Sequence, residues 1–135
     1  MPSTIKSDSI ISSKDSMKTK LALEILQLDR DVFAIAILDI RGNLEAFAAK
    51  DFFARDHHMN KDAWEKEATR NASIVHLANE EISEYNPASG IVFFRKQYKQ
   101  ILIIVPSHKI IIEAIMPLWN HSAVFYDSVY KRFAP

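Results

Sequence analysis

Apolar residues recur at helical spacing in three segments of the chain. In the first, Leu21, Ile25 and Leu28 lie four and three positions apart, and Asp15 or Ser16 precedes them as a candidate N-cap. This spacing places apolar side chains on one face of a helix. The pattern therefore predicts a first helix that begins after the cap and ends near Leu28.

The second periodic segment is the longest. It runs from about Lys61 to Tyr85, with Asn60 as its candidate N-cap, and the segment NPASG at 86–90 ends it. Small and apolar side chains recur along it every three or four residues: Trp64, Ala68, Ala72, Val75, Ala78, Ile82 and Tyr85. We expect one long helix with a continuous apolar stripe.

The third periodic segment follows Pro117. Phe125, Val129 and Phe133 lie four positions apart and predict a last helix over about residues 121–133. Asn120 or Ser122 is its candidate cap.

The residues from Val32 to Ile40 are apolar at nearly every position. A strand that is apolar on both faces belongs inside a sheet with further layers around it. The turn that follows contains Gly42, one of only two glycines, and Leu44–Ala49 predicts the returning strand of a hairpin. No glycine-rich phosphate loop surrounds Gly42, so we interpret this glycine as structural.

Three further β-like segments follow the long helix at short spacing, as in an antiparallel meander: Ile91–Tyr98, Gln100–Pro106 and Lys109–Met116. The last of them is also compatible with a helix that begins at Ser107. Pro117 would break such a helix early, which favours a strand.

The predicted order is helix, two strands, helix, three strands, helix. Hairpin-linked strands with helices packed outside give an α+β domain around a five-stranded, largely antiparallel sheet. We assign this domain to residues 15–135. Residues 1–14 are rich in serine and poor in apolar side chains, so we expect a flexible tail there. Residues 50–60 are interpreted as a polar-aromatic connection.

Composition narrows the range of functions. Lys plus Arg and Asp plus Glu number 17 each, whereas a nucleic-acid binder typically has a basic excess or a basic stripe. The absence of cysteine excludes disulfides, thiolate chemistry and cysteine-ligated metal sites. No apolar run approaches the roughly 18 residues that span a bilayer, and the first residues do not resemble a secretory signal. We expect a cytoplasmic protein without membrane insertion.

The order of elements and the hairpin AILDIRGNLEAF resemble the roadblock/dynein-light-chain-like domains, which share the broader profilin-like and longin-like architecture. Asp39 and Gly42 match the Asp-x-x-Gly turn of those domains, and Lys61–Tyr85 matches their long helix. The resemblance covers about residues 16–133. It implies a non-enzymatic dimerising scaffold, often one that binds small GTPases, in which the long helices and adjacent sheet edges pair.

The turn itself departs from that family pattern. Arg41 and Asn43 flank Gly42 without a second acidic residue, so no residue here supports a GTPase partner. PAS, GAF and cache sensor domains use a similar Asp-x-x-Gly hairpin, and the motif does not separate a scaffold from a sensor. A sensory domain would hold a small ligand in a pocket lined by three aromatic residues, namely Phe33, Phe47 and Phe93.

The leading hypothesis is a protein-interaction module that forms a homodimer. The seam between the two copies is predicted on the small-residue stripe of the long helix: Ala68, Ala72, Val75, Ala78 and Ile82. A helix that covers a sheet needs only one apolar face, so a seam requires further apolar positions, which Ile74 and Leu77 supply. The sequence does not identify any other protein partner.

A basic-aromatic surface is the third possibility. The span from Ile91 to Ile110 lacks Asp and Glu, and its candidate surface consists of Arg95, Lys96, Tyr98 and Lys99. Alternating basic and aromatic side chains can stack nucleic-acid bases. The alternative is that the aromatic rings pack inward while the basic groups are solvated. We place nucleic-acid binding behind the other two functions.

No set of residues predicts catalysis or a cofactor. The densest group of potential metal ligands is Asp56-His57-His58, with Asp51 and Asp62 nearby. Adjacent side chains usually diverge, and no HExxH spacing is present. The chain also has no Gly-x-Ser-x-Gly elbow, and no histidine has neighbours that complete a nucleophilic triad. We therefore expect no catalytic residues and no bound metal or cofactor.

Overall fold

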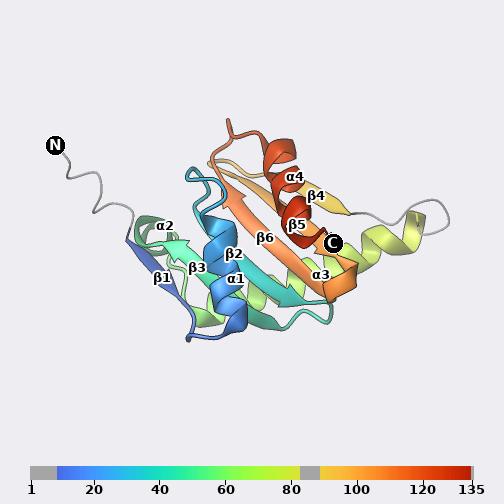
Figure 1. Ribbon diagram of the computed structural model, residues 1–135, viewed down its shortest axis with the longest axis horizontal. Coiled ribbons are helices and arrows are strands. Elements are labelled where there is room, and N and C mark those ends of the chain that lie inside the picture. Colours follow the sequence, from blue (N-terminus) through green and yellow to red (C-terminus); the bar gives the residue numbers. More distant parts are fainter. Residues whose placement is uncertain (1–8, 83–88, 135) are drawn as a thin grey trace.

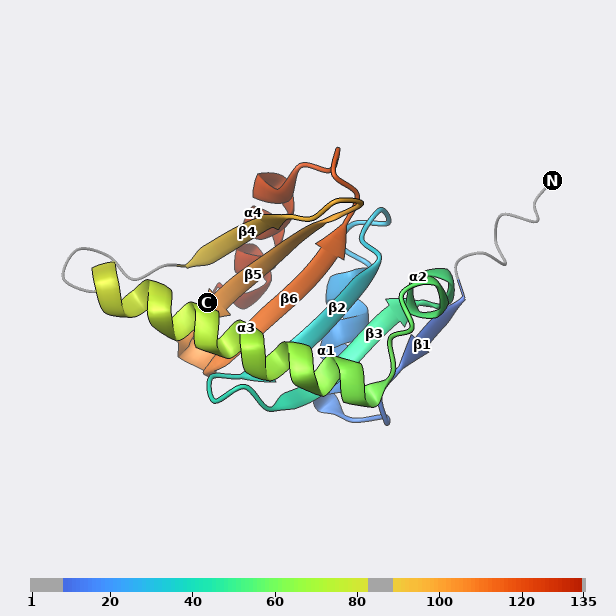
Figure 2. The same cartoon turned by 180° about the vertical axis from the view of Figure 1, so that it is seen from behind.

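An antiparallel sheet lies between two layers of helices in the computed structural model, which describes residues 9–82 and 89–134, the side chains of 80–82 excepted. Helices α1 (Met17–Leu26) and α4 (Ser122–Phe133) cover one face (Figure 1). Helices α2 (Asp51–Asp56) and α3 (Lys61–Ile82) cover the other (Figure 2). This arrangement has the α+β character that the sequence predicts.

The sheet has six strands rather than the predicted five. Their order across the sheet is β1-β3-β2-β6-β5-β4, and each neighbouring pair is antiparallel. The strands are β1 (Ile10–Ser12), β2 (Ala34–Asp39), β3 (Leu44–Lys50), β4 (Gly90–Phe94), β5 (Lys99–Val105) and β6 (Ile110–Met116). The two predicted groups of strands therefore merge into one sheet through the β2–β6 pair.

The additional strand, β1, lies within the segment 1–14 that was predicted to be a flexible tail. It pairs with the outer side of β3, and the Ser13 hydroxyl extends the attachment by accepting a hydrogen bond from the Phe47 N–H at 3.1 Å. The same hydroxyl lies 2.9 Å from the Thr19 hydroxyl at the start of α1. The strand was missed because pairing, rather than burial of its own exposed side chains, holds it in place.

Strand β2 has no water-facing side. Ile35 and Ile37 pack in the core beneath α1 and α4, while Ala36 and Leu38 pack beneath α3. This confirms the predicted strand buried on both faces, although it is shorter than Val32–Ile40: it runs from Ala34 to Asp39, and Ile40 is 41% exposed in the turn that follows. Strand β6 is buried in the same way, so its prediction as a strand rather than a helix is also confirmed.

The predicted starts of the helices hold for two of the three. The Ser16 side chain accepts a hydrogen bond from the Thr19 N–H at 3.1 Å and caps α1, and the Asn60 side chain accepts one from the Ala63 N–H at 2.9 Å at the start of α3. At α4 the N-cap position belongs to His121 instead of Asn120 or Ser122.

Two further expectations concern the end of the long helix and the absence of a membrane-spanning segment. The predicted end of this helix at Tyr85 lies outside the described residues, which show α3 as far as Ile82. Within the described part of the chain, no helix combines the length and the apolar character that crossing a membrane requires.

The β2–β3 turn is structural, as its sequence indicates. Gly42 has a φ of 97°, and a Cβ at this position would lie 3.1 Å from the Cβ of Ala72 on α3. The Asp39 carboxylate accepts hydrogen bonds from the N–H groups of Arg41 and Asn43, each at 2.9 Å. Burial opposes the shift, but these bonds lower the pKa of Asp39. The glycine thus allows the hairpin to close against the long helix.

Candidate functional site

Strand β4 forms one edge of the sheet, where no strand of the described chain pairs with its outer side. Its sequence, GIVFF, contains neither a charge nor a proline. Val92 and Phe94 are 40% and 74% exposed. Edge strands in natural proteins are usually protected by charges, prolines or bulges, because an open edge pairs readily with another chain. The sheet therefore presents an unprotected apolar edge.

The outward-facing backbone groups of this edge can be identified from its pairing with β5. The Arg95 N–H donates to the Tyr98 carbonyl at 2.8 Å, and the Ile104 N–H donates to the Ser89 carbonyl at 3.0 Å. Backbone groups alternate in direction along an antiparallel strand. Residues 89, 91, 93 and 95 therefore point their backbone groups toward β5, and residues 90, 92 and 94 point theirs outward.

The predicted seam residues on α3 divide into three groups. Ala68, Ala72 and Val75 are buried against the sheet of their own chain, in the core that also contains Leu102 and Ile111. Ala78 is half-buried, and the side chain of Ile82 lies outside the described residues. The first three are therefore already used within the chain.

The adjoining side of α3 carries the apolar groups that remain accessible. Leu77 is 63% exposed and Ile74 is half-buried. Together with Ala78 these residues form what we call the apolar flank of α3. The last turns of α3 reach past the sheet on the side of β4 (Figure 2). The last turns of α3, which follow the flank in the chain, and the β4 edge thus lie on the same side of the molecule.

The structure does not bring the four residues of the predicted basic-aromatic surface to one surface. Strand β4 ends at Phe94, so the predicted strand Ile91–Tyr98 is interrupted by a turn at 95–98. Lys99 is 6% exposed and donates to the Asn120 carbonyl. Tyr98 is half-buried, with its ring 5.7 Å from that of Phe53. Of the four predicted residues, only Arg95 and Lys96 have exposed side chains.

The three phenylalanines that were expected around a small ligand pack into the protein instead. The Phe33 ring lies 5.4 Å from that of Phe52, and the Phe47 ring stacks on Trp64 at 5.5 Å. Phe93 packs in the same core, with the Arg95 guanidinium 5.2 Å from the centre of its ring. Each ring therefore has contacts within its own chain, and of the three only Phe47 lines one of the main surface hollows formed by the described residues.

A buried polar cluster lies between α3 and the sheet, and the sequence patterns did not reveal it. Glu113 on β6 is 1% exposed and accepts a hydrogen bond from the Gln100 amide at 2.7 Å. Burial raises the pKa of Glu113 to about 7, although the hydrogen bond from Gln100 and the charges of Arg70 and Arg95 favour the ionised form. Its only sequence signal is a lone acidic residue within the apolar run IIIEAIM.

This cluster does not open onto a main surface hollow of the described chain. Among the described residues, the second oxygen of Glu113, both amide atoms of Asn71 and the indole nitrogen of Trp64 have no hydrogen-bond partner. A buried carboxyl with a raised pKa is a common property of a general base. Glu113 lines none of the main hollows formed by the described residues, however, so nothing places a substrate beside it.

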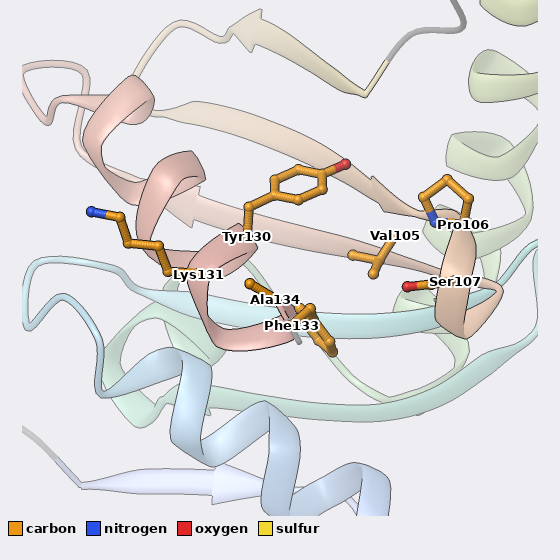
Figure 3. Close-up of a pocket in the computed structure, with 7 residues that line it drawn as sticks. All are labelled: Val105, Pro106, Ser107, Tyr130, Lys131, Phe133 and Ala134. Carbon is orange, nitrogen blue, oxygen red and sulfur yellow. The ribbon is translucent and has the colours of Figure 1, made fainter.

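The largest of these surface hollows lies between the β5–β6 turn and the C-terminal end of α4 (Figure 3). Its polar groups already have partners. Tyr130 donates to the Ile104 carbonyl, the Ser107 hydroxyl lies 2.9 Å from the ring nitrogen of His108, and Lys131 pairs with Asp127 at 3.0 Å. The hollow is otherwise apolar and has no converging groups for chemistry.

The predicted metal-ligand candidates do not converge either. His57 packs against the rings of Phe53 and Tyr98, at 4.4 and 5.4 Å. Asp51 pairs with Arg55. The described part of the chain contains no group of three His, Asp or Glu residues placed to hold a metal ion.

Comparisons with known proteins add to this geometry. No protein-family model matches the sequence. No curated protein matches it either. Among solved structures, MglB from Myxococcus xanthus has a TM-score of 0.68 and 13% identity, with 88% of this chain and 90% of that chain covered.

Two further solved structures match this fold at similar TM-scores. The Roadblock/LC7 domain from Streptomyces avermitilis has a TM-score of 0.63 and 10% identity, and the match covers 80% of this chain and 84% of that one. An MglB in a tetrameric arrangement has a TM-score of 0.64 and 12% identity, with 87% and 85% covered. At such low identities the likeness concerns the fold alone, and the protein has a roadblock-like fold.

Proposed function

We propose that this protein is a non-enzymatic interaction module that forms a homodimer through the β4 edge and the apolar flank of α3. The observation that carries the proposal is the unprotected edge itself. Five residues without charge or proline leave outward backbone groups open, beside two exposed apolar side chains. A second copy supplies a strand of matching length and polarity.

The position of α3 supports the same interface. A partner strand that adds to β4 extends the sheet in the direction in which α3 projects (Figure 2). The exposed Leu77 and the half-buried Ile74 on the flank then gain a surface to cover them. Burial of apolar side chains is the main favourable contribution in most protein association. Edge and flank together therefore form one continuous interface.

The comparisons support self-association without establishing it for this chain. One structural neighbour is an MglB with a tetrameric arrangement, which favours association for this chain as well. The resemblance to roadblock domains also implies pairing of long helices and sheet edges. A chain without cysteine needs no oxidising compartment, which is compatible with the cytoplasmic location expected from the sequence.

The test is the mass in solution of the wild type and of two charge variants. We expect wild type to have twice the mass of one chain by light scattering at micromolar concentration. Val92→Glu brings a carboxylate from each copy to the centre of the paired edges, so this variant is expected to be monomeric. Ile11→Glu on the opposite edge strand β1 is the matched control and is expected to remain dimeric.

Two outcomes would contradict the proposal. One is a monomeric wild type at micromolar concentration. The other is a wild-type dimer that Val92→Glu leaves intact while its circular dichroism spectrum remains native. The second result would place the interface elsewhere on the molecule.

A further inference from the structure

The alternation of backbone groups along β4 restricts how two copies can pair. Only Gly90, Val92 and Phe94 point their backbone groups outward, so these residues must bond to one another across an antiparallel pair. A pairing centred on Val92 uses all five residues of the strand. It sets Val92 against itself, Ile91 against Phe93, and Gly90 against Phe94. A shift by two residues would leave either Gly90 or Phe94 unpaired.

Directly opposed residues in antiparallel strands place their side chains on the same face of the sheet. Ile91 and Phe93 pack in the core beneath α3, so Gly90, Val92 and Phe94 face the α4 layer. The Val92-centred pairing therefore places each Phe94 ring directly beside Gly90 of the partner subunit, on the side of that subunit's α4.

A hollow of about 270 Å³ lies on that face at Gly90. It is lined by Ser89, Gly90, Val92, Ile101, Ser122, Ala123 and Tyr126. A Cβ at Gly90 would lie only 2.9 Å from the Tyr126 ring, so glycine is what allows this ring to lie against the strand. The Tyr126 hydroxyl lies 2.6 Å from the Ser89 hydroxyl, and its ring packs on Tyr130 at 4.7 Å. The aromatic wall of the hollow is therefore held in place.

Phe94 is the counterpart of this hollow. Its side chain is 74% exposed, and Lys99, 5.8 Å from the ring centre, is its cationic neighbour on the same chain. A large exposed ring on an edge strand and a small apolar hollow four residues away are complementary across a two-fold axis at Val92. Aromatic side chains that enter pockets are the usual anchors of interfaces.

We propose that the Phe94 ring of each copy enters the hollow between Gly90 and Tyr126 of the other copy and anchors the dimer in the Val92-centred register. This inference rests on the proposed dimerisation through β4. It goes beyond that proposal by assigning a register, an anchor and a receiving site on the α4 face of the sheet. The occupant is a second copy of this chain.

Single variants test the two halves of the contact. Phe94→Ala removes the ring, and both copies of the contact are lost in the dimer, so we expect the dissociation constant to rise about a hundredfold. Ala123→Trp fills the hollow from an exposed position and is expected to weaken the dimer at least as much. Val124→Trp, at the neighbouring exposed position that does not line the hollow, is the matched control.

A mixture of the two variants provides the sharper test. Phe94→Ala retains an open hollow, and Ala123→Trp retains the ring, so a mixed dimer has one intact contact while neither parent dimer has any. We expect native mass spectrometry of an equimolar mixture to show the mixed dimer well above its statistical share, with a dissociation constant about tenfold below that of either parent.

The outcomes separate this inference from the proposed function. A wild type that is monomeric at micromolar concentration would rule out both the proposed dimer and the Phe94 anchor. A wild-type dimer whose dissociation constant changes less than twofold in Phe94→Ala and Ala123→Trp removes the anchor but keeps the dimer. Loss of affinity in both variants without recovery in the mixture also overturns the inference, because ring and hollow would then act separately.

Discussion

At the scale of single residues, Glu113 is the group whose surroundings least match its chemistry. It lies on a central strand with 1% of its surface exposed, and it receives one hydrogen bond, from Gln100. The charged groups around it are Arg70 on α3 and Arg95 in the β4–β5 turn. The free-energy cost of burying the ionised carboxylate exceeds the stabilisation that these neighbours provide. Glu113 therefore keeps its proton up to near-neutral pH.

This residue makes stability depend on pH. The pKa of Glu113 is about 7 in the folded protein, against 4.5 when unperturbed. Between these values the folded protein keeps a proton that the unfolded chain releases, so the free energy of unfolding falls as pH rises, by about 3 kcal/mol in total. Glu113→Gln is expected to remove this fall in the free energy of unfolding. At pH 8 the variant should therefore be more stable than wild type. Denaturant titrations at pH 5 and pH 8 measure the effect.

The exposed Glu65 on α3 provides the control for this prediction, since Glu65→Gln keeps the buried acid. It should retain the pH dependence of the wild type. An equal difference between wild type and Glu113→Gln at pH 5 and at pH 8 would contradict the assignment.

The roles of single residues that act on nearby backbone groups were predicted from the sequence. Gly42 and the cap residues Ser16 and Asn60 depend on backbone groups within a few positions, and their roles follow from residue type. Lys99 was expected on the surface and Glu113 was not identified, because the burial of both is imposed by neighbouring strands and helices that lie far away in sequence. A lone charge in an apolar strand is the signal that would have identified Glu113.

At the scale of elements, β1 shows how a segment with exposed side chains becomes ordered. Its attachment depends on backbone pairing with β3 and on Ser13, which bonds to the backbone of Phe47 and lies beside Thr19. None of these contacts is visible as hydrophobic periodicity. The same limitation explains α2, a six-residue helix within the predicted connection 50–60.

The hydrogen bonds of Ser13 should therefore contribute measurably to the stability of the β1 attachment. Ser13→Ala removes the hydroxyl that accepts from the Phe47 N–H, and we expect a loss of about 1–2 kcal/mol in the free energy of unfolding. Faster amide hydrogen exchange in β1 and at Phe47 should accompany it. Ser12→Ala, at the adjacent exposed position, is expected to remain within about 0.5 kcal/mol of wild type. Equal effects of the two substitutions would rule out the role given to Ser13.

At the scale of the whole molecule, the order of elements predicted the layers but not the neighbours within the sheet. Alternating and continuous apolar patterns were sufficient to assign the three long helices and the five longer strands, but not β1 or α2. The central β2–β6 pair joins segments about 75 residues apart, from Ala34 with Ile115 to Asp39 with Ile110. No local pattern contains that pairing. The position of β4 at the edge, on which the candidate interface depends, follows only once the pairing is known.

Dimerisation also predicts how stability responds to concentration. A dimer that dissociates on unfolding is stabilised by mass action, so the wild-type melting temperature should rise by about 3–5 °C between 1 and 100 μM chain. Val92→Glu should melt at the same temperature throughout this range. Calorimetry at several concentrations checks both, and a wild-type midpoint that does not move would speak against a dimer.

The short strand β1 has a consequence for the size of any assembly. It occupies the outer side of β3, and with three residues it offers little template for another strand. When two β4 strands pair about a two-fold axis, the remaining long edge of each sheet is consumed. In such a dimer, the described part of the chain leaves only the three-residue edge of β1 for further pairing, which disfavours open-ended growth into a fibre.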